Sequence, residues 1–97
     1  MQLQNKVTNY FYHRNNRYNV TIAYRRSDDG TVEYGASFCR KNERFVKRIG
    51  REIAVGRMNT YVSCIEDAPT ERWMLHEEIL ERLEDREDSY VPNSFTF

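Results

Sequence analysis

Two neighbouring segments of alternating apolar and polar residues constrain the fold more than any other feature of this chain. Residues 18–26 and 31–39 are both rich in β-branched and aromatic side chains, and the polar segment Ser-Asp-Asp-Gly at 27–30 separates them. Alternation over about eight residues is typical of a half-buried β-strand, and a short polar segment containing glycine is typical of a hairpin loop. We therefore predict an antiparallel hairpin.

The length of the loop sets the register of this hairpin. A three-residue loop over residues 28–30 gathers the large apolar side chains of both strands on one face, whereas a two-residue loop does not. The longer loop also places Gly30 at the position that favours a left-handed backbone. The predicted pairs are Tyr24 with Tyr34, Ile22 with Ala36, and Val20 with Phe38.

A third strand is predicted upstream, over residues 7–12. A loop at residues 15–16 would place Phe11 opposite Val20 and extend the apolar face across three strands.

Tyr10 and Tyr12 then fall on the outer face of this strand. Each tyrosine has an apolar ring and a polar tip, so the pair could stack on nucleic-acid bases or anchor a partner. Ordinary strand propensity also accounts for their presence.

Residues 43–58 predict a helix with Asn42 as its N-cap, because apolar residues recur at helical spacing. The apolar face comprises Phe45, Val46, Ile49 and Ile53. The cations of the opposite face are Arg44, Lys47, Arg48 and Arg51. Gly56 lies near the apolar face, where we expect it to let the helix approach the sheet.

A second helix is predicted over residues 68–88, preceded by a short β-branched segment at 60–65 that could form a fourth strand. Leu75, Ile79 and Leu83 form the apolar face of this helix. The other side is acidic and includes Glu77, Glu78, Glu81, Glu84 and Asp85. The segment at 89–97 cannot continue the helix because it contains Pro92.

These elements predict a single α+β domain, since 97 residues allow one modest core. Residues 6–39 would form a three-stranded antiparallel sheet, or a four-stranded one if residues 60–65 join it, with both amphipathic helices packed on one face. The expected core is Phe11, Val20, Ile22, Tyr24, Phe38, Phe45, Ile49, Ile53, Leu75, Ile79 and Leu83.

The charges of the chain are segregated along the sequence. Residues 1–57 contain 12 Lys and Arg against 5 Asp and Glu, a net charge of +7, and residues 58–97 contain 3 against 10, a net charge of −7. Such asymmetry indicates electrostatic partners, with nucleic acid favoured for the basic half. It indicates binding and not a reaction.

No catalytic, metal or cofactor site is recognisable in the sequence. The glycines fit no phosphate-binding loop, and nothing beside His13 or His76 would activate a nucleophile. Cys39 and Cys64 lack the spacing of a zinc site, so we expect both to be reduced. We therefore expect a non-enzyme without a cofactor or a metal. The sequence contains no apolar run long enough to span a membrane, and residues 1–6 are mainly polar, unlike the apolar core of a signal peptide. We therefore expect the protein in the cytoplasm.

The basic helix is the first candidate site. The proposed nucleic-acid-binding residues are Arg40, Lys41, Arg44, Lys47, Arg48, Arg51, Tyr10 and Tyr12. Arginine suits phosphate through its planar donor fork, and each phosphate that is neutralised releases counterions. The alternative is that the basic helix lies against the acidic helix, each neutralising the other, although exposed ion pairs contribute little stability.

The acidic helix is the second candidate site. Its regularly spaced carboxylates, together with the C-terminal tail at 89–97, could bind and inhibit a host defence enzyme, for example by mimicking nucleic acid. The residues proposed for this contact are Glu77, Glu81, Glu84 and Asp85. Whether copies of the chain associate with each other is left open.

The segment at 34–58 reads Tyr-Gly-Ala-Ser-Phe-Cys, continues through Arg-Phe and Gly-Arg-Glu-Ile-Ala, and ends in Arg-Met. It resembles a pattern found in small bacteriophage accessory proteins, in which a hairpin runs into a helix. The resemblance covers about a quarter of the chain and contains no catalytic motif. It implies a host-takeover, counter-defence or nucleic-acid accessory role, acting in the cytoplasm of the host cell.

Overall fold

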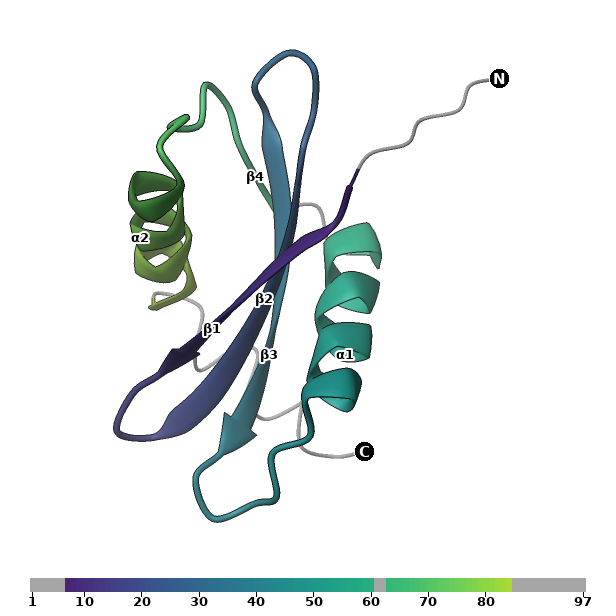
Figure 1. Ribbon diagram of the computed structural model, residues 1–97, viewed down its shortest axis with the longest axis vertical. Helices are drawn as coiled ribbons and strands as arrows, with labels where there is room; N and C mark the ends of the chain where they lie inside the picture. Colours follow the sequence, from purple (N-terminus) through teal and green to yellow (C-terminus); the bar gives the residue numbers. More distant parts are fainter. Residues whose placement is uncertain (1–6, 61–62, 85–97) are drawn as a thin grey trace.

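The computed structural model describes residues 7–60 and 63–84 and has a sheet between two helices (Figure 1). The four strands are antiparallel and ordered β1-β2-β3-β4 across the sheet. The α+β class is therefore confirmed, with the fourth strand. The elements in chain order are β1 (Asn9–Arg14), β2 (Tyr18–Arg26), β3 (Val32–Arg40), α1 (Lys47–Thr60), β4 (Cys64–Ile65) and α2 (Arg72–Glu84).

The register of the central hairpin, β2 with β3, is the predicted one. Tyr24 pairs with Tyr34 and Val20 with Phe38. The Ser27 N–H donates to the Thr31 carbonyl at 2.8 Å and closes a three-residue loop. Gly30 has a φ of 90° in this loop, a conformation that side-chain-bearing residues rarely adopt.

The register between β1 and β2 differs by two residues from the prediction. Phe11 pairs with Ile22 instead of Val20. The cause lies in the turn, where the Asn15 side-chain oxygen accepts hydrogen bonds from the Arg17 and Tyr18 N–H groups at 2.8 and 2.7 Å. A shift of two leaves every side chain on its predicted face, because the side-chain period of a strand is two residues.

The predicted fourth strand is present, as β4. Cys64 and Ile65 pair with β3, opposite Glu33 and Val32, and residues 61–62 lie outside the described residues. Thr60 belongs to α1 instead.

One face of the sheet has large apolar side chains and is covered by α2. Leu75, Ile79 and Leu83 of α2 are at most 2% exposed. They pack in a cluster with sheet residues that include Val20 and Ile22. This cluster is the main core of the domain.

The other face of the sheet has small side chains and is covered by α1. Gly50, Ala54 and Met58 are the buried residues of α1. A Cβ on Gly35 of β3 would collide with the backbone of Ala54 and Met58, and a Cβ on Gly50 would lie 2.6 Å from the Thr21 Oγ1 atom. The helix backbone therefore lies directly against the strands.

The expected packing of both helices on one face is wrong, because α1 and α2 lie on opposite faces of the sheet (Figure 1). The expected core positions of α1 are also wrong. Ile49 is 43% exposed, and Phe45 and Ile53 are only partly buried. The helix contacts the sheet through Gly50, Ala54 and Met58, because the facing strands offer small residues such as Ala23 and Gly35.

Both helices begin later than predicted, α1 at Lys47 and α2 at Arg72. Residues 41–46 form a turn and an irregular segment, in which the Glu43 N–H donates to the Arg40 carbonyl at 3.0 Å, so Asn42 is not an N-cap. The predicted end of the second helix, residues 85–88, and the segment at 89–97 lie outside the described residues.

The expected role of Gly56 in bringing α1 close to the sheet is wrong. A Cβ at this position would meet no atom within 4 Å, so Gly56 takes no part in the close packing. Gly50 has that role instead.

Neither helix in the described ranges has the length and apolar character needed to cross a membrane.

Candidate nucleic-acid interface

Five of the residues predicted to bind nucleic acid lie together on one surface, formed by β1 and α1. Helix α1 packs over β2 and β3 and leaves the same face of β1 open. Tyr10 and Tyr12 of β1 are 39% and 40% exposed on this face. We call the group the β1–α1 surface, and its members are Tyr10, Tyr12, Lys47, Arg48 and Arg51.

The cations of α1 approach the two tyrosine rings closely. The Lys47 Nζ atom lies 4.8 Å from the centroid of the Tyr12 ring, and the Arg51 guanidinium carbon lies 5.8 Å from that of Tyr10. Arg51 also donates a hydrogen bond to the Tyr12 hydroxyl at 3.0 Å. These contacts hold cationic groups beside exposed aromatic rings, an arrangement that suits a phosphate next to a stacked base.

A shallow hollow of about 450 Å³ lies in this surface. Tyr10, Arg48 and Arg51 line it, together with Val55 and Gly56. Gly56 has no side chain to fill the space, so this glycine keeps the hollow open. Tyr10 is therefore accessible from the side on which the two arginines lie.

Glu52 is the acidic residue of this hollow. Its carboxylate forms an ion pair with Arg48 at 3.3 Å, and both side chains are about two-thirds exposed, at 66% and 70%. An exposed pair of this kind contributes little stability. It leaves Arg48 available to an incoming anion and reduces the local positive charge.

Arg40, Lys41 and Arg44 do not belong to α1 and do not line the hollow of the β1–α1 surface. Arg40 ends β3, and Lys41 and Arg44 belong to the segment that leads into α1, with all three exposed. The prediction placed Arg44 on a helix, and that part of the prediction is wrong. Arg44 lines a different hollow, on the Ile49 side of α1.

The acidic side chains lie on α2, across the sheet from the β1–α1 surface (Figure 1). The sheet separates the two helices, so α2 cannot cover the cations of α1 in the same chain. The mutual neutralisation of the two helices, which the sequence left open, does not occur within this fold.

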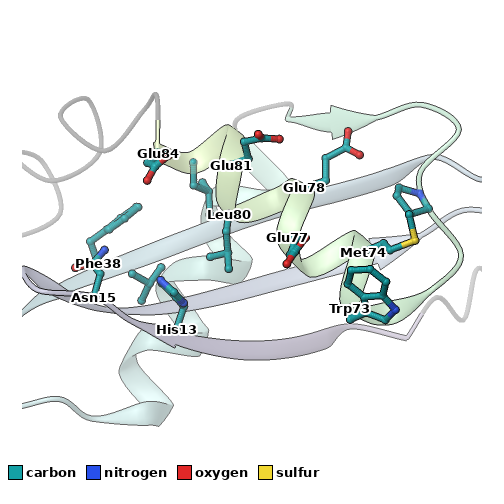
Figure 2. A pocket seen from close by; sticks show the side chains of 13 residues that line it. His13, Asn15, Phe38, Trp73, Met74, Glu77, Glu78, Leu80, Glu81 and Glu84 are labelled. Carbon is teal, nitrogen blue, oxygen red and sulfur yellow. The ribbon is translucent and has the colours of Figure 1, made fainter.

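Glu77, Glu81 and Glu84 line a hollow of about 620 Å³ beside α2, and Asp85 lies outside the described residues. Figure 2 shows Trp73 and Met74 at one end of the hollow, with His13 of β1 and Asn15 of the β1–β2 turn toward the other end. Trp73 is 62% exposed. Sequence reasoning did not predict Trp73 or His13 as residues of this hollow. Trp73 was missed because a tryptophan beside an apolar helix face resembles a core residue.

Cys39 and His76 have shifted pKa values, and neither residue belongs to the β1–α1 surface. Burial raises the pKa of the Cys39 thiol, and the nearby Glu43 carboxylate adds to the effect. The thiol is therefore protonated at neutral pH, in keeping with the free state of both cysteines. Burial lowers the pKa of His76, with a smaller contribution from Arg72.

Across residues 7–60 and 63–84, no three His, Cys, Asp or Glu side chains converge to hold a metal ion.

The fold and this surface define a class: a small α+β domain with a cationic, aromatic surface on one side of its sheet and an acidic surface on the other. No protein-family model, curated protein or solved structure matches the chain.

Proposed function

We propose that this chain is a small non-enzymatic protein of the phage regulatory or counter-defence type, which binds nucleic acid through the β1–α1 surface in the cytoplasm. The observation that supports it most is the convergence of two exposed tyrosines from β1 with three cations from α1. These residues are far apart in the sequence and share no role in the core.

The chemistry of the surface fits a single-stranded segment of RNA or DNA. A base stacked on Tyr10 would occupy the hollow, and Arg48 and Arg51 on its rim would contact the flanking phosphates. Stacking on an exposed ring requires an unpaired base, and such stacking contributes about 1–3 kcal/mol per base. The planar guanidinium groups contact phosphate through two donors at once.

The electrostatic field around the surface supports the same ligand. Three cations face one carboxylate, that of Glu52, and the acidic helix lies on the other side of the sheet. An anionic strand is therefore attracted to the β1–α1 surface and repelled from α2, which orients the protein on its ligand.

The first experiment measures the fluorescence anisotropy of labelled oligonucleotides of about 20 nucleotides at about 50 and 200 mM salt. The Arg48→Ala, Arg51→Ala double variant should bind about tenfold more weakly, with a shallower salt dependence, because two phosphate contacts are lost. The matched control is Arg72→Ala with Arg82→Ala on α2, which removes the same charge and should change the affinity less than about twofold. Circular dichroism melts verify that both variants are folded.

The Glu52→Gln variant gives a prediction of opposite sign. Removing the carboxylate of the hollow should strengthen binding by about two- to fivefold at low salt, because a like charge near the phosphates is lost. The absence of salt-dependent binding to RNA and DNA, or an equal loss in the two double variants, would contradict the proposal.

A further inference from the structure

The hollow beside α2 combines exposed apolar groups with an acidic rim. Trp73 and Met74 are 62% and 43% exposed, and Leu80 is partly buried within the hollow. A single exposed apolar side chain is common on protein surfaces, but a tryptophan at the end of a hollow is a typical anchor of a protein interface. The space of about 620 Å³ is large enough to take more than one aliphatic side chain.

The acidic rim has no cationic partner in the part of the chain that the structure describes. Arg82 pairs with Glu78 at 3.0 Å, and no ion pair involves Glu77, Glu81 or Glu84 in that part. The cations of α1 lie across the sheet. Among the described residues, these carboxylates therefore lack a counter-charge, which a ligand would supply.

The spacing of the rim indicates the shape of such a ligand. Glu77, Glu81 and Glu84 follow each other at intervals of four and three residues, so they form one row along about 10 Å of helix. Cations repeated at the same intervals on a second helix would meet them in order. Nucleic acid is excluded as the ligand of this face by its charge.

We propose that the hollow binds a cationic amphipathic helical segment of another protein. Lys or Arg side chains of that segment pair with Glu77, Glu81 and Glu84, and an adjacent apolar side chain enters the hollow between Trp73 and Leu80 (Figure 2). Binding at this face is independent of the β1–α1 surface. A chain with both activities would hold a nucleic acid on one side of its sheet and a basic protein segment on the other.

The test uses three synthetic helical peptides without tryptophan: one with leucines and flanking lysines, one with glutamates in place of the lysines, and one with serines in place of the leucines. Trp73 is the only tryptophan of the chain, so its emission reports directly on the hollow. The first peptide should shift the Trp73 emission to shorter wavelength in a saturable way. The other two peptides should bind at least tenfold more weakly or not at all.

Two matched variants locate the binding site. Glu81→Gln with Glu84→Gln should weaken the binding of the first peptide at least fivefold. Glu43→Gln with Glu66→Gln removes the same charge at exposed positions that do not line the hollow beside α2, and should leave peptide binding unchanged. Trp73→Ala, measured by the anisotropy of a labelled peptide, should also weaken binding, and its exposure ensures that the fold tolerates the change.

Three outcomes would overturn the proposal. The first is an unchanged Trp73 emission at peptide concentrations up to about 1 mM. The second is equal binding of the leucine and serine peptides, or equal weakening by the two Gln pairs, which would indicate attraction by charge alone. The third is salt-sensitive self-association of the chain that Glu81→Gln with Glu84→Gln abolishes, because a second copy would then be the occupant. None of these outcomes depends on nucleic-acid binding.

Discussion

His76 is a residue of α2, and its ring stacks on that of Phe11 in β1 with 3.8 Å between the centroids. The Tyr24 hydroxyl lies 3.2 Å from its Nε2 atom. Burial in this position, with the Arg72 charge nearby, lowers the pKa of His76 below the ordinary value of 6.5. The folded protein therefore prefers the neutral ring, and a proton binds more readily to the unfolded chain.

This preference predicts a pH dependence of stability. The free energy of unfolding should fall as the pH decreases below about 6.5, because the unfolded state then binds more protons than the folded state. Well above that pH the histidine is neutral in both states, so it adds no pH dependence to the free energy of unfolding. Urea unfolding at several pH values between about 7.5 and 5.5 measures the effect.

The two histidines of the chain provide a matched comparison for this measurement. His76→Phe keeps a ring against Phe11 and should flatten the decline, whereas His13→Gln, at an exposed position of β1, should retain it. An identical decline in His76→Phe and the wild type would show that other groups cause it.

Helix α1 lies close to the sheet because Gly50, and not Gly56, faces the strands. Gly50→Ala would bring a Cβ to 2.6 Å from the Thr21 Oγ1 atom, on a short β-branched side chain that has little freedom to move. We expect this variant to lose about 1–3 kcal/mol of unfolding free energy. Gly56→Ala meets no atom within 4 Å and should gain up to about 1 kcal/mol from helix propensity.

Denaturant unfolding followed by far-ultraviolet circular dichroism distinguishes these two substitutions, because each is a change of Gly to Ala in the same helix. Equal effects of the two, or a stabilising Gly50→Ala, would mean that α1 does not lie so close to the strands.

The strands could be predicted from the sequence more completely than the helices. The alternation of residues 18–26 and 31–39 requires a particular register if the apolar side chains are to share a face, and the structure has that register. The two-residue shift of β1 arises from the hydrogen bonds that the Asn15 side chain accepts in the turn. Turns of similar length fit the same sequence, so the alternation of apolar residues alone does not select this one.

The orientation of α1 could not be predicted, because periodicity favours burial of the largest apolar residues. Ile49 and Ile53 have the right spacing for a core, but the face of the sheet next to α1 is lined by small residues that admit only Gly50, Ala54 and Met58. Rotating the helix in this way turns Lys47 and Arg51 toward the tyrosines of β1. The five residues of the β1–α1 surface were each predicted from the sequence. Their convergence on one surface follows from the packing of α1 against the sheet and could not be predicted.

For the molecule as a whole, the sheet converts a charge difference along the sequence into a charge difference across the fold. The basic helix and the acidic helix cover opposite faces of the sheet. Two other arginines of the basic half donate hydrogen bonds to backbone carbonyls within the domain. Arg26 donates to the Pro69 carbonyl at 2.6 Å, and Arg57 donates to that of Ala36 at 2.8 Å. The formal net charge of zero thus describes two separate surfaces of opposite sign.

The most direct test of the claim that nucleic acid binds only the β1–α1 surface is a two-dimensional amide NMR titration with a short single-stranded oligonucleotide at low salt. Chemical-shift changes should be confined to β1 and α1, and the amides of α2 should be unaffected, because the sheet separates α2 from the ligand. Changes centred on α2, or changes of similar size on both faces, would contradict the account.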